Sequence, residues 1–290
     1  MRLPATLGMV LALFATLVQS APLNAELQTW LKQHPEATWA PEADYGPFIY
    51  LDKQNKPVGL SADFLELAAR KTGLQLRALP AAPLSDNLQK VKRGEVDLLT
   101  SLRPTPERAQ FVSFSSAYVS IPAVLALHPS RTETGLQQLS GAKLGVGKGY
   151  AVESFVRENY PQVKWLAVPS DGAALDLLAR GEIDGLVADA ASLHFLRQEK
   201  NLKLDLRIAG SIGFDYPLSM AWRKDIPQLG EIIQAGLQEI TPVERDAILQ
   251  RWMPSQQNTP AQQQNWLYIA TGGLFALALM SAFWLRRKAG

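Results

Sequence analysis

A seven-residue pattern occurs twice in this chain. Arg-Gly-Glu-Val-Asp-Leu-Leu at residues 93–99 returns as Arg-Gly-Glu-Ile-Asp-Gly-Leu at residues 180–186. In both copies a predicted amphipathic helix ends at the glycine and an apolar strand follows. The copies are too far apart for a solenoid, whose units repeat about every 20–50 residues. Two similar α/β lobes with one such unit each would give this spacing, and a chance recurrence of a common helix–glycine–strand turn is the alternative.

The composition allows a sizeable core and excludes several classes of protein. At 290 residues the chain is long enough for two domains or one two-lobed unit. Hydrophobic residues make up 47% and charged residues 19%, which excludes wholesale disorder. A net charge of +2 without a Lys/Arg-rich run in the body argues against nucleic-acid binding. With no cysteine and three widely spaced histidines, we expect no metal site, and nothing indicates another cofactor.

The N-terminal segment has the pattern of a secretory signal peptide. Residues 1–20 combine an early Arg2, an apolar stretch from Leu7 to Val18 and a small-residue end. An uncleaved anchor helix is the alternative for this segment. We exclude it from the fold in either case.

The C-terminal segment predicts a membrane span. Residues 266–285 carry no charge, and about 20 residues at about 1.5 Å each cross one bilayer core. Aromatic residues lie near both ends of the span, and three cations follow it at once. The tail at residues 286–290 is therefore expected in the cytoplasm and the preceding domain in the periplasm, with the chain in the inner membrane. The alternative is a buried core helix.

A polar, Gln-rich stretch at residues 254–265 separates the span from the folded body and predicts a linker. The body runs from about residue 23 to residue 253, and its alternation of apolar strands and amphipathic helices is typical of an α/β fold. Ser61 is predicted to cap a helix that ends at Gly73. Thr241 opens a capping box with Pro242 at the first position of a helix that reaches Trp252.

The loops after the two repeated strands are the expected ligand sites, because open α/β sheets bind ligands beyond the carboxyl ends of their strands. After the first strand, Thr105 is a natural N-cap, which places Arg108 in the first helical turn. The helix dipole disfavours a cation there unless an anion shares the site, and a guanidinium beside free amides suits a carboxylate. A solvated surface arginine paired with Glu107 or another carboxylate fits the spacing equally well.

After the second repeated strand, Asp189 stands in a small-residue loop that enters a helix. It is either an N-cap or a ligand contact. Together with Arg108 in the other lobe, Asp189 could hold a zwitterion between the lobes. The glycines at residues 145–149 lack the spacing of a phosphate-binding loop and predict a strand-to-helix turn lining the cleft. No catalytic motif or carboxylate pair stands out, so we predict a protein that is not an enzyme.

A series of short motifs resembles bacterial family 3 extracellular solute-binding proteins. The matching segments span nearly the whole body: residues 45–50, 57–64, 94–97, 105–108, 111–118, 181–184 and Asp189. The opening at residues 27–35 and Asn159-Tyr160-Pro161 are more similar to the Venus-flytrap sensor modules of membrane-bound sensor kinases than to free transport receptors.

The resemblance implies two α/β lobes that are joined by two crossovers and close on a ligand. The first lobe would be about residues 36–121 and 217–253, and the second about residues 122–216. The crossovers would lie near residues 119–123 and 213–218, with Pro122 and Pro217 at strand ends. The last helix, residues 241–252, would then lie on the first lobe.

The resemblance also implies roles for individual residues. Tyr45 would pack on the ligand, Arg108 would bind its carboxylate and Asp189 its amine. The loop at Ser101, Leu102 and Arg103 would line the same pocket.

The chain departs from the family at two positions. Arg103 stands where a small or hydroxylated residue is common, and Tyr150-Ala151 replaces the usual hydroxyl-bearing residues of the second lobe. We count Tyr150 among the expected ligand-binding residues, and either the pocket is partly filled or the ligand is not a standard α-amino acid.

Three functions remain open. The first is a membrane-anchored periplasmic sensor for a small amino acid or carboxylate, with a signalling partner. The second is an anchored substrate-binding component of an amino-acid ABC transporter, with a permease partner. The third is an enzyme on the same fold, such as a dehydratase or a peptidoglycan lyase relative.

Overall fold

The computed structural model describes residues 23–199 and 206–253. The predicted signal peptide (1–20), linker (254–265), membrane span (266–285) and tail (286–290) all lie outside the described residues. Within those described, no helix combines the length and the apolar character needed to cross a bilayer.

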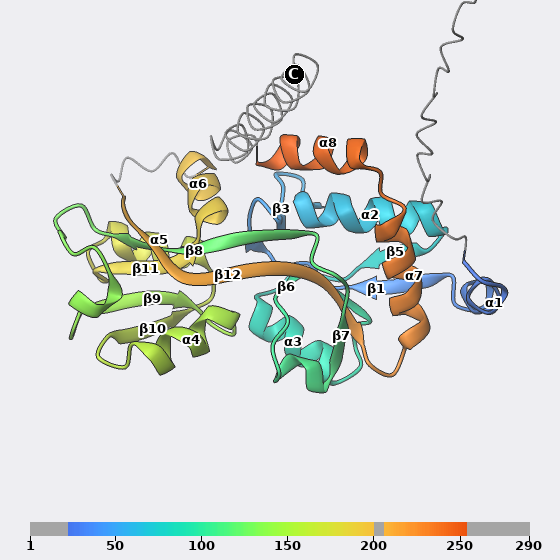
Figure 1. The fold of residues 1–290 in the computed structure, drawn as a ribbon, viewed down its shortest axis with the longest axis horizontal. Coiled ribbons are helices and arrows are strands. Elements are labelled where there is room, and N and C mark those ends of the chain that lie inside the picture. The colour runs from blue at the N-terminus through green and yellow to red at the C-terminus, as the bar shows by residue number, and fades with distance from the viewer. Residues whose placement is uncertain (1–22, 200–205, 254–290) are drawn as a thin grey trace, which may run out of the picture.

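Two α/β lobes lie side by side and share two long strands that cross between them, β8 (Val119–Leu127) and β12 (Arg207–Arg223) (Figure 1). The strand order is β10-β9-β11-β8-β12-β6-β1-β5, with β7 also pairing with β12. This arrangement confirms the predicted two-lobed α/β fold.

The first lobe contains the described elements from α1 to β7 and the last two described helices, and a small three-stranded sheet β2-β3-β4 lies beside its main sheet. Its elements are α1 (Ala25–Gln33), β1 (Glu36–Trp39), β2 (Asp44–Tyr45), β3 (Ile49–Leu51), β4 (Pro57–Val58), α2 (Leu60–Thr72), β5 (Gln75–Ala78), α3 (Leu84–Lys92), β6 (Leu98–Leu102), a 3-10 turn (Arg108–Gln110), β7 (Val112–Phe114), α7 (Pro227–Gln238) and α8 (Pro242–Trp252).

The second lobe is a parallel sheet, β10-β9-β11, joined to β8 by an antiparallel pairing. Its elements are a 3-10 turn (Leu136–Gln138), β9 (Lys143–Gly147), α4 (Ala151–Asn159), β10 (Lys164–Val168), α5 (Asp171–Ala179), β11 (Gly185–Asp189) and α6 (Ala190–Glu199). The carboxyl ends of its parallel strands therefore share one edge, and β9 separates β10 from β11.

The two copies of the repeated pattern form the same local structure, one in each lobe. Each glycine of the pattern has a left-handed backbone, with φ of 76° and 71°, which glycine adopts without strain. In the first copy Asp97 accepts a hydrogen bond of 2.9 Å from the backbone N–H of Thr38 in β1. In the second, Asp184 accepts one of 2.8 Å from Lys143 in β9. In both lobes the aspartate thus fastens a neighbouring parallel strand, so each lobe contains one such unit.

The structure confirms one predicted helix start and corrects the other. Thr241 forms the expected capping box at the start of α8. Helix α2 ends at Gly73 as predicted, but its N-cap is Gly59 and not Ser61. A Cβ on Gly59 would lie 2.3 Å from the carbonyl oxygen of Phe48, so only glycine fits there. Ser61 lies inside the helix, where its hydroxyl accepts hydrogen bonds from other side chains.

The two shared strands form the connection between the lobes. Pro122 lies opposite Asp215, and Pro217 opposite Ser120, within the paired stretch of β8 and β12. The prediction that both prolines lie at strand ends is therefore wrong. The pairing register shifts between Ser211 and Asp215, so the hydrogen-bond ladder between β8 and β12 is already irregular beside Pro122. The ladder therefore loses less from the missing backbone N–H of Pro122.

Helix α8 packs on the first lobe, against α2, as predicted (Figure 1). The indole N–H of Trp252 donates a 2.7 Å hydrogen bond to Asp63 in α2. Lys71, also in α2, pairs with Glu244 at 2.8 Å. The last helix before residue 254 is thus fixed to one lobe only.

Candidate functional site

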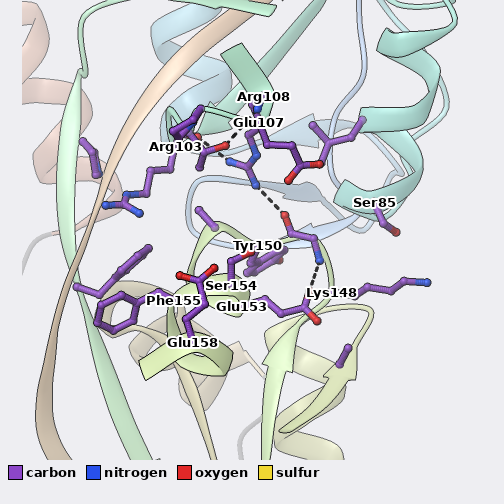
Figure 2. Close-up of a pocket in the computed structure, with 18 of the residues that line it drawn as sticks. Ser85, Arg103, Glu107, Arg108, Lys148, Tyr150, Glu153, Ser154, Phe155 and Glu158 are labelled. Carbon is purple, nitrogen blue, oxygen red and sulfur yellow. Dashed lines mark hydrogen bonds between the residues drawn. The ribbon is translucent and has the colours of Figure 1, made fainter. Parts of the chain in front are cut away.

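The cleft between the lobes has two connected parts, which we call the inner cavity and the outer groove. The inner cavity is about 10 Å³ in volume, room for about one water molecule. The outer groove is about 1220 Å³. Arg103 and Arg108 of the first lobe and Tyr150 of the second line both parts, and Figure 2 shows how they border the groove.

Arg108 is a buried cation that ties the two lobes together. Its side chain is only 5% exposed. One terminal nitrogen donates to the carbonyl oxygen of Arg103 in its own lobe at 2.7 Å, and the other to Gly149 across the cleft at 2.7 Å (Figure 2). Burial lowers its pKa to about 10, so it stays charged at neutral pH.

The surface-arginine alternative is therefore wrong. Arg108 begins a 3-10 turn rather than a longer helix. The N-cap of this turn is Glu107, so the prediction that Thr105 is the N-cap is wrong, and the Thr105 hydroxyl instead accepts a 3.2 Å hydrogen bond from the Arg108 backbone N–H. The short turn brings the guanidinium down into the cleft.

Glu42 is a buried acid at the inner cavity that the sequence reasoning missed. Its carboxyl accepts a 3.4 Å hydrogen bond from the Tyr150 hydroxyl, which belongs to the other lobe. Burial raises the pKa of Glu42 to about 8, against the opposing influence of the positive charge on Arg108. Its position just beyond the carboxyl end of β1, after the buried Ala40, is the signal that could have found it.

Three tyrosines wall the inner cavity: Tyr45, Tyr150 and Tyr216. The Tyr45 and Tyr150 rings approach across the cleft with centroids 5.5 Å apart. The Tyr150 ring also lies against the Gly147 backbone, where a Cβ would be only 2.5 Å away. Tyr150 thus occupies space at the inner cavity, beside Tyr45 and Gly147.

The predicted loop at residues 101–103 is a loop only at Arg103, because Ser101 and Leu102 are the last two residues of β6. Ser101 lines the inner cavity with a left-handed backbone, φ 56°, while its hydroxyl donates to Ser61 at 2.7 Å. Leu102 is fully buried in the core and lines neither part of the cleft. The guanidinium of Arg103 stacks over the Phe214 ring, 3.8 Å from its centroid, at the border of the outer groove.

Asp189 is buried at the start of α6 and is not among the residues that line the inner cavity or the outer groove. One carboxylate oxygen accepts a 2.7 Å hydrogen bond from the backbone N–H of Ser192 and so caps α6. The other oxygen is buried and has no hydrogen-bond partner within the described ranges. Burial raises its pKa to about 6.

Asp171 is a second acid that the sequence reasoning missed. It is the first residue of α5 and is 2% exposed. Neither carboxylate oxygen has a hydrogen-bond partner among the described residues. Burial raises its pKa well above its ordinary value, and the negative charges of Asp189, Asp44 and Glu42 act in the same direction.

The chain belongs to family 3 of the bacterial extracellular solute-binding proteins, whose sequence profile matches residues 38–255. It is 25% identical over 234 residues to the sensor protein EvgS of Escherichia coli O157:H7, covering 80% of this chain and 19% of EvgS. It is also 25% identical over 274 residues to the virulence sensor protein BvgS of Bordetella pertussis, covering 91% of this chain and 22% of BvgS. The chain therefore spans about a fifth of the length of these sensor proteins.

The solved VFT2 domain of Bordetella pertussis BvgS has the same fold. The TM-score is 0.72 at 24% identity, over 81% of this chain and all of the solved one. The chain is thus a solute-binding domain of the Venus-flytrap type, related to sensor proteins.

The chain is also similar to two proteins of other classes. A putative arginine-binding protein 2 of an ABC transporter in Escherichia coli K12 is 26% identical over 210 residues, covering 70% of this chain and 84% of that protein. The membrane-bound lytic murein transglycosylase F of Idiomarina loihiensis is 26% identical over 183 residues, covering 60% of this chain and 40% of that protein. The family is mainly one of binding and sensor domains, and an enzyme occurs among the relatives.

Proposed function

We propose that this protein is a membrane-anchored periplasmic sensor module that binds a small amino acid or carboxylate between its lobes. The observation that carries the proposal is Arg108, a buried cation that contacts the backbone of both lobes. A buried charge is costly without a partner, and a planar guanidinium matches a carboxylate in shape and charge. A ligand carboxylate beside Arg108 would thus link the lobes through a single charged group.

The remaining contacts suit the other end of an amino acid. A guanidinium has five N–H donors, and the two carbonyl bonds of Arg108 leave others for a carboxylate. The unpaired oxygen of Asp189 would accept from an ammonium group. The Tyr45 ring, which is buried and lines the inner cavity, would pack on the carbon skeleton.

Binding requires the lobes to part and the Tyr150 side chain to move, because the inner cavity of about 10 Å³ is far smaller than an amino acid. The ligand then shifts the lobes toward a closed arrangement only to the extent that it binds this arrangement more tightly than the open one. Strands β8 and β12, shared by both lobes, are the hinge for this motion.

The sensor proposal also includes the membrane. In it, residues 1–20 direct export, residues 266–285 span the inner membrane and the tail at 286–290 is cytoplasmic. Since α8 is fixed to the first lobe by Trp252 and Asp63, lobe closure would move the second lobe relative to the membrane. The similarity to EvgS and BvgS supports a signalling partner or output domain.

An anchored substrate-binding component of an amino-acid transporter is the second candidate, favoured by the similarity to the arginine-binding relative. Deleting the gene separates the two. A transport role predicts loss of labelled amino-acid uptake. A sensor role predicts a changed expression response to the ligand with unchanged uptake.

Thermal unfolding of the full chain in mild detergent, screened against amino acids and small carboxylates, tests the ligand class. A ligand at about 100 times its dissociation constant should stabilise the fold by about 2.7 kcal/mol, or about 5–11 °C in Tm. Arg108→Ala should abolish this shift, whereas Arg245→Ala should retain it. Arg245 is a matched control because it also donates to a backbone carbonyl, that of Tyr118, but outside the cleft. A retained shift in Arg108→Ala would overturn the proposed site.

A further inference from the structure

Three aromatic rings form a row from the second lobe to the end of the last described helix. Phe195 of α6 packs on Tyr50 of β3 with ring centroids 4.8 Å apart. Tyr50 in turn meets Trp252 of α8 edge-on, with centroids 6.2 Å apart. Both pairs lie in the range of about 4.5–7 Å in which aromatic rings attract each other. Figure 1 shows β3 between α6 and α8, in keeping with Tyr50 as the middle ring of this aromatic row.

Phe195 belongs to the second lobe and lies against the backbone of the first. A Cβ on Gly46 would collide with the Phe195 ring, so the absence of a side chain at residue 46 makes room for this contact. Three residues earlier on α6, the Ser192 hydroxyl donates a 2.9 Å hydrogen bond to the Gly46 carbonyl oxygen. Helix α6 therefore contacts the first lobe at the segment between β2 and β3.

These contacts require the two lobes to be together. Ser170, just before α5, donates a 2.7 Å hydrogen bond to Asp44 of β2, so a second segment of the second lobe holds the same part of the first. Tyr50 stays with the first lobe, because β3 pairs with β2 and β4 and contacts α2. Phe195 moves with α6. When the lobes part, Phe195 must therefore leave Tyr50.

Trp252 is contacted from two sides by the first lobe. Its indole N–H donates to Asp63 of α2, and the Tyr50 ring meets its ring system. Trp252 is the last residue of α8 and stands two positions before residue 254, where the predicted linker begins. The hydrogen bond to Asp63 lies wholly within the first lobe, whereas the Tyr50 ring also packs on the second. Part of the packing at the end of α8 thus depends on where the second lobe lies.

We propose that the aromatic row reports the arrangement of the lobes to the end of α8. With the lobes together, Phe195 holds the Tyr50 ring against Trp252. When the lobes part, Phe195 withdraws, the Tyr50 ring is free to turn, and the last turn of α8 loosens. Phe195 is then a positioning residue that acts through Tyr50. The proposal rests on the proposed sensor function for its purpose, and adds a route from the second lobe to residue 254 that does not pass through β8 and β12.

Fluorine NMR of the full chain in mild detergent, labelled with 5-fluorotryptophan, tests the far end of the row. Trp252→Phe identifies the Trp252 resonance among those of the seven tryptophans. Tyr50→Ala gives its position without the middle ring. Phe195→Ala should move the resonance in the same direction, and so should Gly46→Ala, whose added Cβ displaces Phe195. His194→Ala removes an exposed ring at the preceding position of α6 and should leave the resonance in place.

Hydrogen exchange at the end of α8 gives the size of the effect. The Met253 N–H closes the last turn by donating to the Leu249 carbonyl oxygen at 2.8 Å. Loss of one aromatic pair changes a local equilibrium about two- to tenfold. Exchange of the amides of residues 250–253 should therefore be about two- to tenfold faster in Phe195→Ala and in Tyr50→Ala. In the double variant the two effects should not add, because Phe195 acts through Tyr50.

The opposite results overturn the proposal. An unmoved Trp252 resonance in Phe195→Ala and Gly46→Ala would show that the row transmits nothing, and additive effects in the double variant would show that Phe195 does not act through Tyr50. An equal movement in His194→Ala would show that the response is not specific to Phe195. Gly46→Ala decides if Phe195→Ala does not fold. The measurements use no ligand, so the row can fail while the proposed ligand binding stands, and the reverse.

Discussion

Glu42 should make the protein less stable as the pH rises. Its pKa is about 8 in the folded protein against an ordinary value of 4.5, because burial penalises the charged carboxylate. Because the folded protein favours the protonated form, Glu42 contributes to the free energy of unfolding. This contribution is fully present below pH 4.5 and is lost as the pH rises through 8. The shift of about 3.5 pH units corresponds to at most about 5 kcal/mol. At pH 5–7.5 the slope is about −1.4 kcal/mol per pH unit.

The assay is the thermal unfolding of the full chain at pH 5, 6, 7 and 8 and constant ionic strength. For a domain of this size about 1 kcal/mol corresponds to about 2–4 °C, so Glu42 alone should lower Tm by about 6–12 °C between pH 5 and pH 8. Glu42→Gln keeps the shape of the side chain but cannot ionise, so it should remove the part of the slope that Glu42 contributes. Glu158→Gln, an exposed carboxylate of the same cleft, should keep it.

Asp189, whose pKa burial raises to about 6, and Asp171, whose pKa burial raises well above its ordinary value, act in the same direction, so a smaller downward slope should remain in Glu42→Gln. Arg108, with a pKa near 10, is charged throughout this range and adds no slope. A Tm that stays level or rises between pH 5 and pH 8, or the same slope in Glu42→Gln, would refute the reasoning.

Three further predictions concern the Tyr150 side chain at the inner cavity, the packing of α7 on α2 and the orientation of the chain in the membrane. Tyr150→Ser should enlarge the inner cavity and bind ligand about tenfold more tightly by calorimetry; equal or weaker binding would show that Tyr150 does not compete with the ligand. Gly236→Ala should lower Tm by about 5 °C in a thermal scan, since its Cβ would lie 2.3 Å from the Ala68 carbonyl oxygen between α7 and α2; an unchanged Tm would contradict that contact. A topology reporter fused after Gly290 should be active only in the cytoplasm, and periplasmic activity would reverse the proposed orientation.

Features that depend on neighbours in sequence could be predicted. The capping box at Thr241 involves residues three positions apart, and the repeated unit needs only a glycine, an apolar strand and an aspartate in order. Ser61 shows the limit of such rules. A serine before an apolar run is a common N-cap, but here Gly59 already starts the helix and the hydroxyl bonds Tyr118, 57 positions away.

The cleft could be predicted only in part, because its residues meet through tertiary structure. Arg108 and Asp189 follow the two repeated strands, so their loops were identifiable. Glu42, Asp171 and Tyr216 come from segments without a motif, and only the contact between the lobes brings them together. No local pattern reports that a carboxylate will be buried without a partner, since burial depends on the other lobe.

The central claim is that a small ligand closes the two lobes, and a distance between them tests it most directly. The chain has no cysteine, so Gln89→Cys and Gln198→Cys give one exposed spin-label site in each lobe, on α3 and α6. Addition of saturating L-arginine should shift the measured distances to one narrower, shorter distribution. Arg108→Gln in the same background should show no shift. An unchanged distribution in the labelled protein with intact Arg108, at saturation proven by calorimetry, would contradict the account.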